Sequence, residues 1–193
     1  AGNHAQGVAH HAQRLGIPAT IVMPSTAAFT KVANTEALGA TVVQAGVSYA
    51  DSATLAETLA AEAGLTLVHP YDDPAVIAGQ GTLALELLAD HDLDVVIAPI
   101  GGGGLIAGIA ILVAERSPET EAIGVQSTTS PGMVAALDGR TLDVATADTL
   151  ADGIAVRDPG TLTVPIVRAL VDDVVTAEEL DLERAIVLYL EIE

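Results

Sequence analysis

Apolar residues recur along this chain in two alternating patterns. Short runs rich in Val, Ile and Ala are typical of buried strands, and stretches with apolar residues three and four apart are typical of helices. Because the patterns alternate, they predict an α/β fold with parallel strands covered by helices. The predicted strands are 19–23, 40–44, 65–69, 95–100, 122–126 and 173–176, and the predicted helices are 1–15, 25–38, 48–63, 75–89, 106–113, 162–170, one that begins near 131 and one that begins at 177.

Small polar residues and glycines indicate where these elements begin and end. Ser25 can cap one helix and Ser48 or Asp51 another, and Gly16 and Gly64 are typical of helix ends.

The loop from Pro70 to Pro74 is the best candidate for a domain boundary, because it holds two prolines and two aspartates. We therefore expect two α/β units, each a parallel sheet in three layers. The expected domains are a small one at 1–72 and part of a large one at 73–193. A cleft between such units is a usual place for a ligand.

The most informative stretch is a predicted strand at 95–100 that leads directly into Gly101, Gly102, Gly103 and Gly104 and then into a predicted helix. Consecutive glycine N–H groups, together with the N-terminus of a helix, can hold a phosphate. The alternatives are a flexible turn or close packing. The spacing does not match the dinucleotide or P-loop motifs, so it favours a single phosphate on a small cofactor.

Composition limits the classes of function. Half of the 193 residues are hydrophobic, and the formal net charge is −19, which disfavours nucleic acids and anionic membranes as partners. The spread of this acidity suggests a salt-adapted surface, although an ordinary acidic protein remains the alternative. The chain has no cysteine, and its histidines do not form a cluster with the spacing of metal ligands. The sequence therefore predicts no metal site. No long apolar span or basic leader occurs, so we expect a cytoplasmic protein.

A second candidate site lies at the start of the chain. Asn3 stands where an N-cap of the first helix is expected, and the N–H groups that follow can bind an anion such as a carboxylate. A plain asparagine cap is the simpler interpretation of these residues taken alone, and His4 is equally ambiguous.

Six motifs, taken together and in this order, carry a resemblance that spans almost the whole chain. They are AGNHAQG at 1–7, ATIVMP at 19–24, HPYDDP at 69–74, GQGT at 79–82, GGGGL at 101–105 and ADGIAV at 151–156. The chain resembles the threonine dehydratase (threonine ammonia-lyase) family of serine/threonine dehydratases. The resemblance implies a two-domain tryptophan synthase β-like fold of type II, here incomplete at both ends, with pyridoxal 5′-phosphate as cofactor.

The resemblance also implies roles for particular residues. Asn3 would bind the phenolic oxygen of the pyridoxal ring, and Gly153 would lie close to the face of the ring. The substrate carboxylate would be received by N–H groups of Gly2, Asn3 and His4. The phosphate would be held by Gly101, Gly102, Gly103, Gly104 and Leu105.

The implied reaction is dehydration and deamination of L-threonine, and of L-serine as a secondary substrate, to a 2-oxo acid and ammonia. Such chemistry belongs to amino-acid metabolism, including isoleucine biosynthesis, and relatives are dimers or tetramers. Serine racemase or another β-eliminating lyase is one alternative, and a non-catalytic module that binds a phosphate ligand is another. A Rossmann-type dehydrogenase domain is a third and weaker one.

The chain departs from the family pattern in several places. The lysine that forms a Schiff base with the cofactor lies upstream of the asparagine motif in this family, and Lys31, the only lysine here, matches an ordinary position. Both ends look cut, so we expect no catalytic residue within the chain and no activity from it alone. Gln126 stands where cation-binding relatives have glutamate, which predicts that the cation site is absent or weakened.

The remaining acidic residues receive structural interpretations. Asp72, Asp73 and Asp152 are expected to serve as loop and capping groups. A solvated helix face is expected at Glu178, Glu179, Asp181, Glu183 and Arg184.

Overall fold

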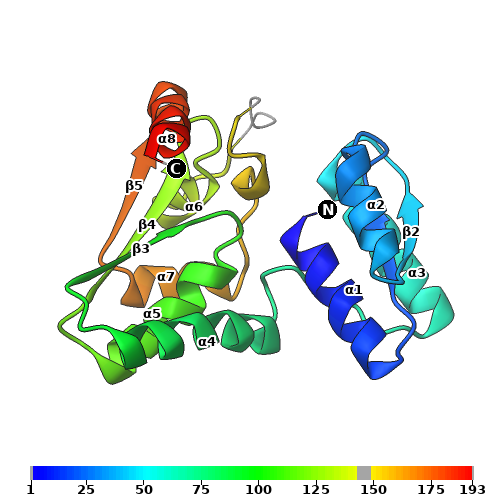
Figure 1. Ribbon diagram of the computed structural model, residues 1–193, viewed down its shortest axis with the longest axis horizontal. Coiled ribbons are helices and arrows are strands. Elements are labelled where there is room, and N and C mark those ends of the chain that lie inside the picture. The colour runs from blue at the N-terminus through cyan, green and yellow to red at the C-terminus, as the bar shows by residue number, and fades with distance from the viewer. Residues whose placement is uncertain (1, 143–148, 193) are drawn as a thin grey trace. The chain divides into compact units, whose positions relative to one another are not determined.

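The structure is a computed structural model of the chain, and it describes residues 2–142 and 149–192. Helices alternate with parallel strands, which confirms the predicted α/β class (Figure 1). The chain divides into two compact units, residues 1–68 and residues 69–193, called here the N-terminal and C-terminal units. The division falls a few residues before the expected boundary at 72.

The N-terminal unit contains a two-stranded parallel sheet and three helices. β1 and β2 pair with Thr20 opposite Thr41, and the buried side chains of Ala5, Ala9 and Met23 contribute to the core of this unit. The elements are α1 (Asn3–Leu15), β1 (Thr20–Met23), α2 (Phe29–Ala37), β2 (Thr41–Gln44) and α3 (Tyr49–Ala63).

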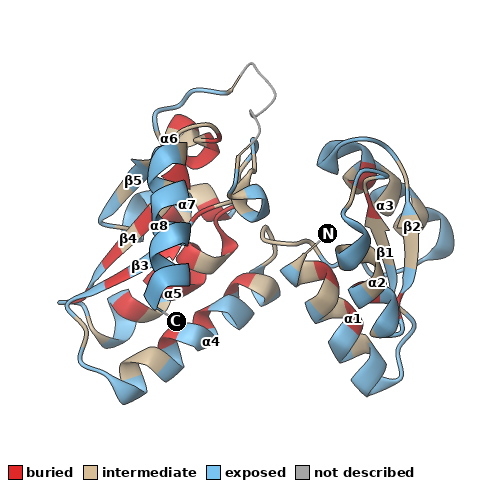
Figure 2. Ribbon diagram, turned by 45° about the horizontal axis from the view of Figure 1, so that its top comes forward, coloured by how far each residue is buried: buried red, intermediate tan, exposed pale blue. Residues whose placement is uncertain are grey.

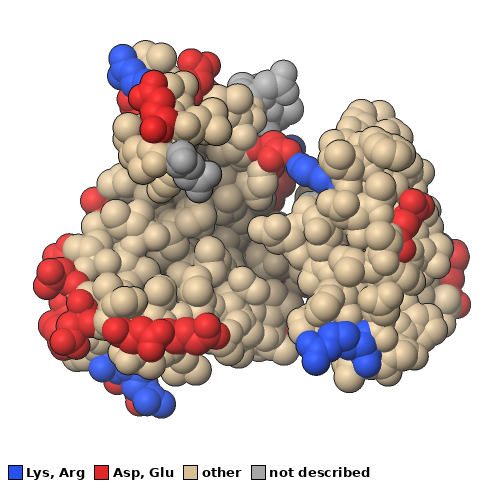
Figure 3. Space-filling view, viewed as in Figure 1, with Lys and Arg blue, Asp and Glu red and all other residues tan. Residues whose placement is uncertain are grey.

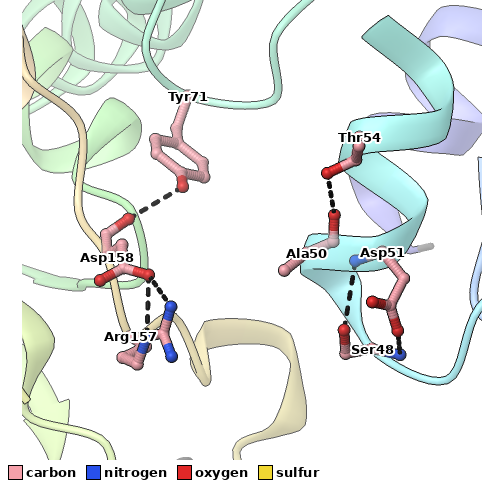
Figure 4. Close-up of polar contacts among 7 residues, drawn as sticks. All are labelled: Ser48, Ala50, Asp51, Thr54, Tyr71, Arg157 and Asp158. Atoms are coloured by element: carbon pink, nitrogen blue, oxygen red, sulfur yellow. Dashed lines mark hydrogen bonds and ion pairs between the residues drawn. The ribbon is translucent and has the colours of Figure 1, made fainter. Parts of the chain in front are cut away.

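Of the two candidates that the sequence offered, Ser48 caps α3. The Ser48 hydroxyl accepts a hydrogen bond from the Asp51 N–H, and the Asp51 carboxylate accepts one from the Ser48 N–H at 2.9 Å, which completes a capping box (Figure 4). Hydrogen bonds from the Ser48 side chain and from the Val47 and Ser48 N–H groups lower the pKa of Asp51. Gly64 ends the helix in the left-handed conformation.

The predictions for Ser25 and for residues 65–69 are wrong. Ser25 does not cap α2, because its N–H and its hydroxyl both donate to the Gly46 carbonyl, and the helix begins four residues later at Phe29. Residues 65–69 do not form a strand, and the side chains of Leu65 and Val68 are exposed. An apolar run forms a strand only if another strand lies beside it to pair with. In this segment the Val68 carbonyl accepts a hydrogen bond from the His4 side chain and not from a neighbouring strand.

The C-terminal unit is built on a three-stranded parallel sheet in the order β3, β4, β5. Ala98 lies opposite Gly124, which lies opposite Val174. The elements are α4 (Pro74–Asp90), β3 (Val95–Pro99), α5 (Gly104–Arg116), β4 (Glu121–Ser127), α6 (Gly132–Leu137), a 3-10 turn η1 (Asp152–Ile154), α7 (Thr163–Leu170), β5 (Asp173–Ala177) and α8 (Glu179–Ile192).

The core of the C-terminal unit lies between the sheet and α5 (Figure 2). Side chains alternate along β3, so that Val96 and Ala98 are buried while Ile97 is 65% exposed. Helices α4 and α5 approach closely because both carry glycine at the contact: a Cβ on Gly81 would lie 2.9 Å from the Gly108 carbonyl oxygen. The largest buried side chains of this core are Ile100, Ile106, Ile109, Met133 and Val167.

Acidic side chains lie in several separate groups on the face drawn in Figure 3, in keeping with the net charge of −19. Within the described ranges, none of the helices has the length and apolar character needed to cross a membrane. Because β3, β4 and β5 are parallel, the loops that follow them share one edge of the sheet, where ligands of open α/β sheets usually bind.

Candidate cofactor-binding site

The glycine loop joins the end of β3 to the start of α5. Gly103 occupies the N-cap position with a φ of 98°, a left-handed conformation that glycine adopts without the Cβ clash of other residues. Its carbonyl accepts the first hydrogen bond of the helix, from the Ala107 N–H at 2.9 Å. The sequence therefore predicted both the loop and the helix that follows it.

One side of this loop is packed tightly against the protein. A Cβ on Gly102 would overlap the Tyr71 ring, and a Cβ on Gly103 would lie 2.6 Å from Met133 Cε and 2.8 Å from Thr163. Close packing, one of the alternative interpretations of the glycine run, is thus a real requirement at these positions. The Tyr71 ring is itself held by an edge-on contact with the His69 ring and by donation of its hydroxyl to the Asp158 carbonyl at 3.0 Å (Figure 4).

Two carbonyl groups of the loop point into the protein and are hydrogen-bonded there. The Ile100 carbonyl accepts from Gln126 Nε2 at 3.1 Å. The Gly102 carbonyl accepts from the buried Thr163 hydroxyl at 2.6 Å and from the Gly160 N–H at 3.1 Å.

The N–H groups of the loop have a different environment. Across residues 2–142 and 149–192, no protein acceptor receives a hydrogen bond from the N–H groups of Gly101 to Gly104. The partial positive charge at the start of α5 adds to these donors, and such an arrangement binds anions. The loop therefore fits the phosphate of a small cofactor.

Asp72 fixes the segment that contacts the Gly102 carbonyl. Its carboxylate accepts hydrogen bonds from the N–H groups of Thr161, Leu162 and Thr163 and from the Thr161 hydroxyl, at 2.8 to 3.3 Å. Burial raises the pKa of Asp72, but these hydrogen bonds outweigh that effect, and the pKa lies below its ordinary value. Asp72 and Asp73, which caps α4, are loop and capping groups as predicted.

Glu179 is an exception to the solvated face expected on the last helix, where Glu178, Asp181, Glu183 and Arg184 are exposed. Its carboxylate accepts hydrogen bonds from the Thr149 hydroxyl at 2.6 Å, from the Ser127 hydroxyl at 2.7 Å and from the Leu150 N–H at 3.0 Å. The bonds from Thr149 and Ser127, then that from Leu150, lower the pKa of Glu179 to about 2. Glu179 thereby fastens the start of α8 to the segment that leads into η1.

Gly153 lies in η1 and is exposed, and a Cβ placed on it would meet no atom of the protein within 4 Å. The protein's own packing therefore does not require glycine at this position, in contrast to Gly102 and Gly103. Its expected place near the cofactor ring stays a prediction.

The residues expected to bind substrate lie at the start of α1. Asn3 is not the N-cap, because Gly2 takes that position with a φ of 104°, and Asn3 becomes the first helical residue with an exposed side chain. His4 Nε2 lies 2.9 Å from the Val68 carbonyl oxygen; because the carbonyl accepts, this nitrogen carries the proton. Gly2, Asn3 and His4 belong to the N-terminal unit, and the glycine loop belongs to the C-terminal unit.

Gln126 uses both ends of its amide. Besides donating to Ile100, its Oε1 accepts from the Val134 N–H at 3.1 Å, so the buried side chain joins the glycine loop to α6. Among the described residues, no three His, Cys, Asp or Glu side chains are grouped as metal ligands would be.

The family model for pyridoxal-phosphate dependent enzymes matches residues 1–193. The chain belongs to this family. Among curated relatives, it is 47% identical over 193 residues to the L-threonine ammonia-lyase of Thermotoga maritima, covering 99% of this chain and 48% of the relative. It is 47% identical over 187 residues to the L-threonine dehydratase catabolic TdcB of Staphylococcus aureus, covering 96% of this chain and 54% of the relative. The chain thus spans about half the length of these relatives.

Solved structures agree with the fold implied by the sequence. The T.th. threonine deaminase is 43% identical with a TM-score of 0.88, over 96% of this chain and 62% of that chain. Maize serine racemase is 34% identical with a TM-score of 0.87, over 93% of this chain and 55% of that chain. The fold is the tryptophan synthase β-like fold of this enzyme family.

Sequence reasoning missed the side chains that surround the glycine loop. Tyr71 and Asp72 lie within the HPYDDP motif, which carries the family resemblance but gave no hint of contact with the loop. No local sequence pattern pointed to Thr163 or Glu179, because each forms its hydrogen bonds with residues about 30 or more positions away in the chain.

Proposed function

We propose that the protein catalyses the pyridoxal-phosphate-dependent dehydration and deamination of L-threonine, with L-serine as a secondary substrate, to a 2-oxo acid and ammonia. The observation that carries the proposal is the glycine loop at the start of α5. Within the part of the chain that the structure describes, its N–H groups donate to no protein acceptor. The 47% identity to an L-threonine ammonia-lyase along nearly the whole chain supports the choice of substrate.

Within this proposal, the C-terminal unit binds the cofactor. The N–H groups of Gly101, Gly102, Gly103, Gly104 and Leu105 hold the phosphate, and Gly153 leaves room beside the ring. The bound cofactor supplies an electron-withdrawing ring that stabilises negative charge at the substrate Cα.

The N-terminal unit supplies the contacts with the reacting end of the substrate. The first N–H groups of α1, around Gly2, Asn3 and His4, receive the substrate carboxylate, and the exposed Asn3 side chain donates to the phenolic oxygen of the cofactor. We assign no proton-transferring residue to this chain.

We further propose that the protein acts in the cytoplasm as a homodimer or homotetramer, in amino-acid metabolism that includes isoleucine biosynthesis. The names of the threonine ammonia-lyase relatives support the metabolic role. The excess of 26 acidic over 7 basic residues supports a salt-adapted surface.

The test is an assay of the protein expressed from its complete gene and purified with pyridoxal 5′-phosphate. Release of 2-oxobutanoate from L-threonine, faster than release of pyruvate from L-serine, is the expected result. Reduction with borohydride followed by peptide mass analysis should label one lysine other than Lys31. A protein that binds the cofactor but gives no labelled lysine and no 2-oxo acid would be a non-catalytic binding module, and the proposal would be wrong.

Racemisation is the second candidate, because maize serine racemase is 34% identical with a TM-score of 0.87. Incubation with L-serine separates the two: a lyase produces pyruvate, whereas a racemase produces D-serine. Production of D-serine in excess of pyruvate would replace the proposed function with racemisation.

A further inference from the structure

The hydrogen bonds to the loop carbonyls bear on which way its N–H groups point. In a planar trans peptide, the C=O of one residue and the N–H of the next point in opposite directions. All peptide bonds of the described residues are trans. A carbonyl that is held against the protein therefore turns the following N–H away from that contact.

Two residues hold such carbonyls beside the glycine loop. Gln126 holds the Ile100 carbonyl, which orients the Gly101 N–H, and Thr163 holds the Gly102 carbonyl, which orients the Gly103 N–H. The Thr163 hydroxyl is fully buried and lies 2.6 Å from the Gly102 carbonyl oxygen and 3.2 Å from the Gly160 carbonyl oxygen, so the shorter and stronger hydrogen bond is the one to Gly102.

The segment that carries Thr163 is fixed in turn by Asp72. Four hydrogen bonds from residues 161–163 end on this carboxylate, and Gly160, which also donates to the Gly102 carbonyl, packs directly against it. The order of contacts is thus Asp72, then residues 160–163, then the Gly102 carbonyl. None of these side chains needs to contact the cofactor.

We infer that Thr163, supported by Asp72, is a positioning residue for the phosphate of the cofactor: by holding the Gly102 carbonyl, it directs the Gly103 N–H toward the phosphate. The inference rests on the proposed cofactor site and adds to it the residues that preset its donors. Preset donors bind an anion without a cost of reorganisation at the moment of binding.

The test compares two ligands that differ only in the phosphate. The protein from the complete gene, freed of cofactor, is titrated by equilibrium dialysis with pyridoxal 5′-phosphate and with pyridoxal. In Thr163→Val, which keeps the shape of the side chain and removes its donor, affinity for pyridoxal 5′-phosphate should fall about tenfold, and affinity for pyridoxal by less than about twofold. Thr163→Ser, which keeps the hydroxyl, should retain the wild-type ratio of the two affinities.

Thr120→Val is the matched control. Thr120 is also buried, and its hydroxyl donates to the Leu93 carbonyl at 2.7 Å, away from the glycine loop. The Thr120→Val variant should be less stable than the wild type, but the ratio of its affinities for pyridoxal 5′-phosphate and pyridoxal should not change. An equal loss for both ligands in Thr163→Val, or no loss for either, would overturn the positioning role while leaving the proposed function in place. Failure of the wild-type protein to bind pyridoxal 5′-phosphate would overturn the proposed function, and this inference with it.

Discussion

The contact between Gly102 and the Tyr71 ring makes Gly102→Ala a sharp test of the packing. The added Cβ would lie well under 3.0 Å from three ring atoms, a separation that real Cβ atoms do not show. The ring cannot turn aside freely, because its edge contact with His69 and its hydrogen bond to the Asp158 carbonyl hold it. Either the ring or the glycine loop must therefore move.

The expected cost follows from measured effects of overpacking. Extra methyl groups in well-packed sites cost about 1 to 3 kcal/mol. We expect the upper end, about 3 kcal/mol, because the clash involves a ring held at two places. For a chain of about 150 to 250 residues, a loss of that magnitude lowers Tm by about 6 to 12 °C.

Thermal unfolding followed by circular dichroism measures the effect, and Gly79→Ala is the matched control. Gly79 lies inside α4, and a Cβ there would meet no atom within 4 Å, so this change should stabilise the protein by about 0.5 to 1 kcal/mol. In the double variant with Tyr71→Ala, the cost of Gly102→Ala should shrink by at least about 1 kcal/mol. A Gly102→Ala variant as stable as the wild type, or costs that simply add in the double variant, would refute the argument.

Four further predictions follow from the structure. The pKa of Glu179 is about 2 in the folded protein, below its ordinary value of 4.5, so the stability that its ionised form gives the folded state is complete above pH 4.5 and disappears as the pH falls toward 2. Urea midpoints should therefore fall less between pH 5 and pH 2 in Glu179→Gln than in the wild type or in the control Glu178→Gln. Parallel pH dependences in the three proteins would contradict this. Ser48→Ala removes the cap of α3 and should cost about 1 kcal/mol in urea unfolding; an unchanged midpoint would argue against the capping box. Gly153→Ala should leave Tm unchanged but weaken binding of pyridoxal 5′-phosphate in equilibrium dialysis, and undiminished binding would remove Gly153 from the site. Raising KCl from about 0.1 to 2 M should raise Tm by screening repulsion among acidic groups, and a lower Tm would count against a salt-adapted surface.

The elements that could be predicted from the sequence are those whose signals are local. The cap at Ser48 and the glycine at position 64 both act within one turn of their helix, and α3 lies where they place it. Residues 65–69 show the limit of such reasoning, because a strand also needs a partner at the right distance, and an apolar run does not reveal whether one exists.

The candidate site divides in the same way. The glycine loop and the start of α5 follow from adjacent residues, so the sequence predicted them together. The predicted N-cap of α1 was wrong by one residue. Gly2, with its non-helical positive φ, is the N-cap, and Asn3 is the first residue of the helix. The hydrogen bonds of Asp72 to residues 161–163 and the role of Thr163 could not be found, since they come from a contact between segments far apart in the chain that no local pattern encodes.

Gly102 and the residue whose hydroxyl holds its carbonyl lie far apart in the sequence, so they are synthesised at different times. Thr163 follows Gly102 by 61 positions, and it follows Asp72 by 91. At typical rates of translation, a ribosome needs about 3 to 12 s to make the residues between Gly102 and Thr163. During that interval the nascent chain contains the four glycines but not the Thr163 hydroxyl. The proposed phosphate-binding surface is therefore completed only after β3 and β4 have been synthesised.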